Sequence, residues 1–65
     1  MEQKRILKRH IGRPIDWRGA EGQIINGQVV KVQNGVATVN YWIPEHTGTF
    51  THYMPVNSPR IVEVY

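Results

Sequence analysis

The side chains most able to carry chemistry are few and widely separated in this 65-residue sequence. The only imidazoles are His10, His46 and His52, and the last two would lie about 20 Å apart on one extended strand. Zinc binds its ligands at about 2.1 Å, so that pair would need a fold-back turn and further ligands. The carboxylates are scattered, cysteine is absent and Ser58 is followed by a proline, so no nucleophile with a nearby base is indicated. We expect no enzyme activity, no cofactor and no metal site.

The basic residues are concentrated near the N-terminus. Six cations opposed by only Glu2 and Asp16 give residues 1–18 a net charge of +4, whereas two cations and three carboxylates give residues 19–65 a charge of −1. The six cations are Lys4, Arg5, Lys8, Arg9, Arg13 and Arg18. A basic arm on a nearly neutral body is typical of proteins that bind polyanions, and it is equally compatible with a solvated terminus.

The length and composition limit the architecture to one small domain. A chain of 65 residues buries only about 60% of its unfolded surface, and without cysteine no disulfide can reinforce it. The absence of cysteine fits a reducing, cytoplasmic environment. We find no signal-peptide pattern and no apolar run near the roughly 18 residues that span a bilayer. We therefore expect a cytoplasmic protein without a membrane association.

Alternating apolar residues and turn-forming residues predict an all-β domain. The predicted strands cover residues 13–18, 23–33, 36–42, 49–54 and 60–65. Asn34-Gly35 tolerates positive φ at both positions, as a two-residue hairpin turn requires. A second Asn-Gly pair, Asn26-Gly27, is compatible with either a bulge or a full turn, and the short arm before it favours a bulge.

The hairpin around Asn34-Gly35 predicts which side chains form the core. With Val32 opposite Ala37 and Val30 opposite Val39, one face carries Val30, Val32, Ala37, Val39 and Tyr41, and we expect this face to be buried. The other face carries Val29, Lys31, Val36, Thr38, Asn40 and Trp42, which is unusually apolar for a solvent-facing side. Trp42 is either part of a contact surface or covered by a neighbouring segment.

Residues 1–12 form either a basic arm or a short helix, and residues 13–65 form the β domain. Ile6, Leu7, His10 and Ile11 would share one stripe of a helix that Gly12 and Pro14 would end. A helix this short is marginal in water unless it docks on the body. We expect the arm to contribute to ligand binding and little to folding.

Two segments resemble small barrels of known families. Gly12, the loop Gly19-Ala-Glu-Gly22 and the apolar Ile24 resemble the opening of KOW-type barrels. The second segment is similar to the second hairpin of the small crenarchaeal chromatin proteins, and its matching positions are Gly35-Val36, Pro44-Glu45, Thr47-Gly48, Phe50, His52, Met54-Pro55 and Pro59. The resemblance implies a single five-stranded antiparallel SH3-like barrel, and the chromatin proteins bind duplex DNA with the outer face of a sheet.

The sequence departs from the chromatin proteins where they contact DNA. Their basic residues beside the histidine fall on Thr51 and Tyr53 here, and Gln33-Asn34 replaces their lysine-rich loop. The resemblance therefore favours the fold more than the DNA binding.

Two functional hypotheses follow, and both use the same surface. The first is a binding module for nucleic acid, in which the six N-terminal cations and Lys31 neutralise phosphates while Trp42 and Tyr53 stack on bases. The second is a protein–protein interaction module, such as an accessory subunit, an inhibitor of a larger enzyme or a homodimer, that uses the same apolar face. The sequence leaves the oligomeric state open.

Overall fold

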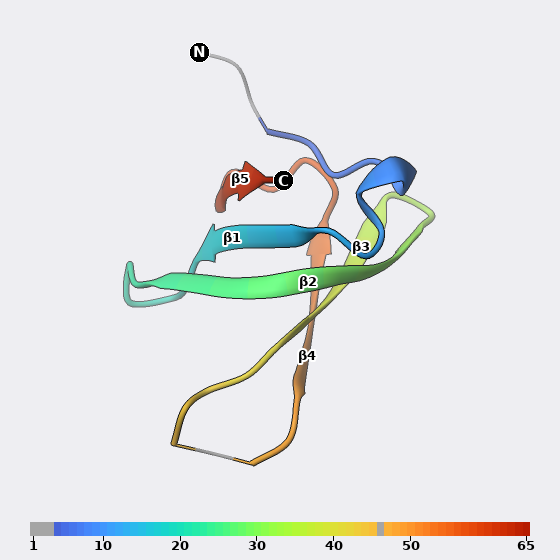
Figure 1. Ribbon diagram of the computed structural model, residues 1–65. Coiled ribbons are helices and arrows are strands. Elements are labelled where there is room, and N and C mark those ends of the chain that lie inside the picture. Colours follow the sequence, from blue (N-terminus) through green and yellow to red (C-terminus); the bar gives the residue numbers. More distant parts are fainter. Residues whose placement is uncertain (1–3, 46) are drawn as a thin grey trace.

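One antiparallel sheet contains nearly all of the regular secondary structure of the protein. The computed structural model describes residues 4–45 and 47–65 (Figure 1). Its elements are the 3₁₀ helix η1 (Lys8–His10) and the strands β1 (Pro14–Arg18), β2 (Ile24–Gln33), β3 (Val36–Tyr41), β4 (Phe50–Pro55) and β5 (Ile61–Val64). The strand order is β4-β3-β2-β1-β5, and every neighbouring pair is antiparallel. The prediction of an all-β domain with five antiparallel strands is confirmed.

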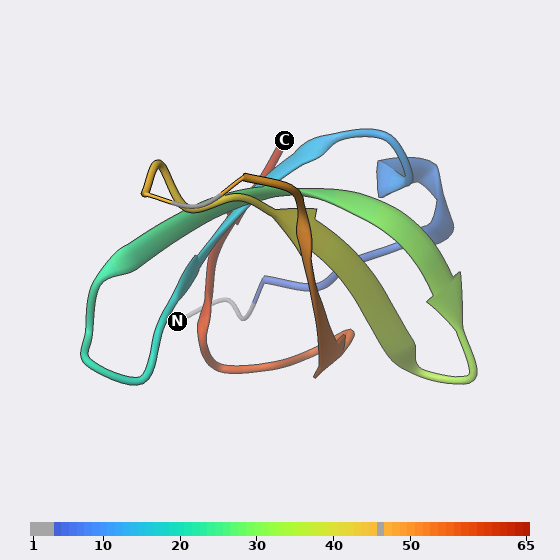
Figure 2. The ribbon, with the colours of Figure 1, turned by 90° about the horizontal axis from the view of Figure 1, so that it is seen from below.

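The sheet is strongly curved, and its hydrogen bonding does not close it into a barrel. Seen from below, β2 and β3 arch over the interior, and the segment that follows the N-terminus passes beneath the arch (Figure 2). The end strands β4 and β5 are not paired with each other in the sheet order. The N-terminal segment instead bonds to the residue that follows β4: the Ile6 N–H donates a 2.8 Å hydrogen bond to the Val56 carbonyl. The N-terminal segment therefore occupies the side of the sheet where a barrel would close.

The core lies inside the arch. Its buried apolar residues are Ile6, Ile15, Trp17, Val29, Ala37, Val39, Met54, Val56 and Ile61. Trp17 is central to the aromatic packing, because Tyr41 meets it edge-on at a ring distance of 5.5 Å and His52 lies parallel to it at 5.7 Å. Burial of these side chains supplies the main favourable free energy of folding.

The β2–β3 hairpin turns where the sequence predicts. Asn34 and Gly35 have φ values of 52° and 77°, and Gln33 pairs with Val36 and Val32 with Ala37. The two positive φ angles give the turn the twist that matches the flanking strands.

A bulge at Val30 changes which side of β2 faces the core. Val29 pairs with Val39 and Lys31 with Thr38, so Val30 is an extra residue without a partner on β3. A one-residue insertion shifts the alternation of the strand by one position. Val29 is therefore fully buried and Val30 is exposed, the reverse of the prediction, whereas Ala37 and Val39 are buried as predicted.

The second Asn-Gly pair neither bulges nor turns. Asn26 and Gly27 pair regularly with Asp16 and Ile15 of β1. A Cβ on Gly27 would lie 2.5 Å from the Asn40 carbonyl oxygen and 2.8 Å from the Trp17 ring. The glycine is required because the tryptophan ring covers the strand at this position, so the prediction of a bulge here is wrong.

The N-terminal segment is part of the folded domain. Ile6 is 1% exposed and belongs to the core, so the prediction that the arm contributes little to folding is wrong. The predicted helix is reduced to η1, in which the Leu7 N–H donates a 2.8 Å hydrogen bond to Nδ1 of His10. Leu7 and Ile11 are exposed, so the predicted apolar stripe does not dock as a unit. The buried Ile6 side chain and the hydrogen bonds of Ile6 to Val56 and of Gly12 to Val29 fix the segment to the sheet.

Candidate functional site

A cation and an aromatic ring lie in one row that runs from the central strand β2 to the end strand β4. Lys31 on β2 pairs with Thr38 on β3, which pairs with Tyr53 on β4. Side chains of directly paired residues point to the same side of a sheet, and here the Lys31 side chain is exposed and the Tyr53 side chain is 67% exposed. We call the outward side chains of β2, β3 and β4 around this row the Lys31–Tyr53 face.

The Lys31–Tyr53 face is free of negative charge. No aspartate or glutamate occurs in β2, β3 or β4. The neighbouring outward positions carry neutral side chains, namely Gln28, Gln33, Val36, Asn40, Thr51 and Pro55. A negatively charged ligand would therefore meet attraction from Lys31 and no opposing carboxylate on these strands.

Further cations lie close to this face. The η1 helix, which carries Lys8 and Arg9, contacts β2. Within the described residues, no other side chain forms an ion pair or hydrogen bond with the side chains of Lys8, Arg9, Lys31 or Arg5. No contact within the described part of the chain occupies these four charged groups.

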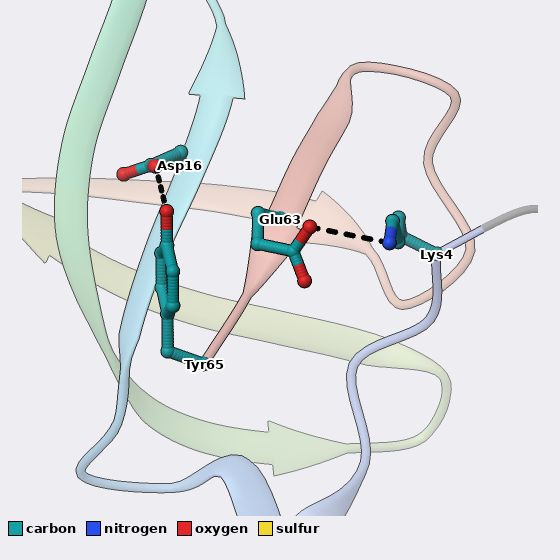
Figure 3. Close-up of polar contacts among 4 residues, drawn as sticks. All are labelled: Lys4, Asp16, Glu63 and Tyr65. Carbon is teal, nitrogen blue, oxygen red and sulfur yellow. Dashed lines mark hydrogen bonds and ion pairs between the residues drawn. The ribbon is translucent and has the colours of Figure 1, made fainter.

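Three of the predicted binding cations instead make contacts within the fold. The Lys4 Nζ lies 3.2 Å from a carboxylate oxygen of Glu63 on β5 (Figure 3). The Arg13 guanidinium donates to the main-chain oxygen of Tyr65 at 3.2 and 3.3 Å, and Arg18 donates to the Gly22 carbonyl at 3.3 Å. Because these residues are largely exposed, each contact contributes little to stability, but it directs the charge away from the Lys31–Tyr53 face.

Trp42 belongs to a different surface. It is 63% exposed and, with residues at the start of β2 and the end of β3, lines a groove of about 510 Å³. The lining residues are Gln23, Ile24, Ile25, Asn26, Tyr41, Trp42, Ile43 and Pro44. Trp42 directly follows β3 and is four positions from Thr38, which is about 13 Å at 3.3 Å per residue of extended chain. The single surface predicted from the sequence is therefore two: the Lys31–Tyr53 face and this Trp42 groove.

The sequence interpretation missed the apolar partners of Trp42. Ile24 is 48% exposed and Ile43 is 36% exposed, and both line the groove. Adjacent apolar residues in a strand point to opposite faces. The pair Ile24-Ile25 therefore carried the signal that one isoleucine must lie outside the core.

The only carboxylate on β1 is fully engaged. The Asp16 Oδ1 accepts a hydrogen bond from Asn26 at 2.5 Å, and its Oδ2 accepts one from the Tyr65 hydroxyl at 2.7 Å (Figure 3). This hydrogen bond stabilises the protonated phenol and, with partial desolvation and the nearby charges of Asp16 and Glu63, raises the pKa of Tyr65 above its ordinary value. Asp16 therefore joins β1 and β2 to the end of the chain after β5.

The two histidines that the structure describes belong to different elements, His10 to η1 and His52 to β4. His52 stacks on Trp17, His10 accepts the Leu7 hydrogen bond, and His46, which the sequence analysis considered as a zinc ligand, lies outside the described residues. Among the described residues, no three histidine or carboxylate side chains are close enough to hold a metal ion.

No family model, curated protein or solved structure matches the chain. Among the described residues, no helix is long and apolar enough to cross a membrane. The two exposed surfaces are therefore the guide to function.

Proposed function

We propose that the protein is a small non-enzymatic module that binds nucleic acid with its Lys31–Tyr53 face. One observation carries this proposal: a lysine without an ion-pair partner among the described residues and an exposed aromatic ring share a cross-strand row on strands that lack any carboxylate. A phosphate backbone needs cations, and bases need an aromatic surface. The face offers both within one row.

The N-terminal cations extend this binding surface. Lys8 and Arg9 lie on η1, which is held next to β2 between Ile6, anchored in the core, and Gly12, whose N–H donates a 2.7 Å hydrogen bond to the Val29 carbonyl. Anchoring reduces the conformational entropy that these cations lose when they bind a phosphate. Arg5 adds a fourth cation without an ion-pair partner in residues 4–45 and 47–65, whereas Lys4, Arg13 and Arg18 have partners within the domain.

The fold is compatible with this role. We propose that the chain is related to SH3-like barrels, of which the resemblance to KOW-type and chromatin-protein segments is one sign. The sheet order β4-β3-β2-β1-β5 and the strong curvature of the sheet support the proposal (Figure 2). The chromatin proteins use the outer face of their sheet, and we propose that the Lys31–Tyr53 face corresponds to it.

The test compares two lysine variants of the full chain. Lys31→Gln and Lys4→Gln remove the same charge, but only Lys31 is unpaired and on the proposed face. We expect Lys31→Gln to weaken oligonucleotide binding and to reduce its salt dependence by about one phosphate contact, and Lys4→Gln to change both far less. Equal effects of the two variants would indicate nonspecific attraction to net charge and would reject the face as the site.

The Trp42 groove favours a second candidate function, the binding of a protein partner. Its lining is mainly apolar, and Ile24, Trp42 and Ile43 are exposed there. If a second copy of the chain fills the groove, sedimentation should detect a dimer that Trp42→Ala dissociates. If Trp42→Ala leaves the oligomeric state unchanged, the groove is not a homodimer interface, and its partner would be a different protein.

A further inference from the structure

We infer that the ligand of the Lys31–Tyr53 face is a single strand of nucleic acid, whose base stacks on Tyr53 while its phosphate contacts Lys31. This inference rests on the proposed function and makes it more specific. It follows from the spacing of the row, the surroundings of the ring and the distribution of charge around the face.

The row has the dimensions of a single nucleotide contact. Neighbouring strands are about 4.8 Å apart, so two strand spacings place the backbones at Lys31 and Tyr53 roughly 10 Å apart. The residue between them, Thr38, is short and half-buried. The lysine chain can therefore extend over Thr38 toward the phosphate of a nucleotide whose base lies on the ring.

The Tyr53 ring is free to stack on a base. The ring contacts among the described residues involve Trp17, Tyr41, Phe50 and His52, and none involves Tyr53. Tyr53 lies on β4, the end strand of the sheet, and its neighbours on the same face of β4 are Thr51 and Pro55. A base can therefore approach the ring from the open edge of the sheet as well as from above.

The charges are arranged for one phosphate backbone. Lys31 and η1 lie on the β2 side of Tyr53, whereas residues 42–59, which include β4 and its flanking loops, contain no lysine or arginine. Arg5 is the exception on this side. It lies beyond the end of β4, because the N–H of its neighbour Ile6 donates a hydrogen bond to the Val56 carbonyl. A sheet that enters a groove of duplex DNA lies between two phosphate backbones and benefits from cations on both sides. This face has them mainly on one side.

A direct comparison of single-stranded and duplex ligands tests the inference. A fluorescein-labelled 12-nucleotide oligothymidylate and a mixed-sequence duplex of the same number of phosphates would be titrated with the full chain at low salt, and binding followed by anisotropy. We expect the single strand to bind at least about tenfold more tightly. Tyr53→Leu should weaken binding of the single strand by about 5- to 150-fold, the equivalent of one base stack, and Tyr53→Phe should retain most of the affinity.

Trp42→Leu is the matched control, because it removes an exposed aromatic residue from the groove instead of the face. It should leave the affinity for the oligonucleotide unchanged. The inference is overturned if the duplex binds as well as or better than the single strand. It is also overturned if Tyr53→Leu binds the single strand like the parent while its amide NMR spectrum shows an intact fold. In either case the proposed function survives if Lys31→Gln still weakens binding. If neither ligand binds at low salt, both the inference and the proposed function fail.

Discussion

Trp17 lies so close over Gly27 that no side chain fits between them: a Cβ at Gly27 would come within 2.8 Å of the ring and 2.5 Å of the Asn40 carbonyl oxygen. Trp17 in turn stacks on His52 of β4 and meets Tyr41 of β3. The close approach of β1 to β2 therefore positions the Trp17 ring. This ring contacts β3 and β4, the two strands that carry the Tyr53 side of the proposed face.

Gly27→Ala should destabilise the protein by about 1–3 kcal/mol, because the backbone oxygen of Asn40 cannot move away as a flexible side chain could. Gln33→Ala, at an exposed position of the same strand, is the control for introducing alanine into β2. Urea unfolding of both variants measures the difference. Equal stabilities of the two variants would show that the Trp17–Gly27 contact does not constrain the sheet.

Ile6 and Leu7 test whether the N-terminal segment belongs to the fold. Ile6→Ala removes a side chain that is 1% exposed and should cost about 2–5 kcal/mol, whereas Leu7→Ala, at 38% exposure, should cost much less. Thermal unfolding of the two variants supplies the comparison. If both variants melt like the parent, the segment is not docked and Lys8 and Arg9 lose their fixed position beside β2.

The bulge in β2 makes Val29 and Val30 a second pair of adjacent residues whose substitution should affect stability differently. Val29→Ala opens a cavity in the core and should lower the free energy of unfolding by about 1–3 kcal/mol, whereas Val30→Ala should have a small effect. Regular alternation through β2 would reverse this order, so the two unfolding curves distinguish the bulged strand from a regular one.

The Tyr65–Asp16 hydrogen bond predicts a stability difference that disappears at high pH. Because the folded protein raises the pKa of Tyr65, this contribution is fully present below the unfolded pKa near 10 and is lost as the pH rises through the folded pKa. The parent should therefore exceed Tyr65→Phe in stability at pH 7, and the difference should shrink above about pH 10. A difference that stays constant to about pH 11.5 in urea unfolding would show that the phenol proton does not contribute.

The local sequence signals predicted the elements and missed the contacts between elements. The Asn34-Gly35 turn, the five strands and the burial of Ala37 and Val39 follow from alternation and turn chemistry. The bulge at Val30 could not be read from these signals, because Val29 and Val30 are the same residue type and alternation cannot choose between them. The requirement for Gly27 depends on Trp17, ten positions away and on another strand.

The candidate site shows the same limit. Tyr53 and Lys31 were both identified as exposed, but their common row depends on the pairing of three strands, and the bulge contributes to the register that aligns them. Trp42 was assigned to the same side by counting residues, whereas the end of β3 and the start of β2 place it in a separate groove. The partners of Lys4, Arg13 and Arg18 are residues distant in sequence or in a loop, which a charge count does not identify.

The most direct test of nucleic-acid binding by this face is the salt dependence of oligonucleotide affinity for the unmodified chain. If Lys8, Arg9 and Lys31 each neutralise one phosphate of a single strand, the logarithm of the association constant should fall linearly with the logarithm of the salt concentration, with a slope of about −2. Neutralising all three residues with glutamine should remove this part of the slope, so that at most a contribution of about −0.7 from Arg5 remains. Affinity weaker than millimolar at low salt, or a slope that the triple variant leaves unchanged, would contradict the account.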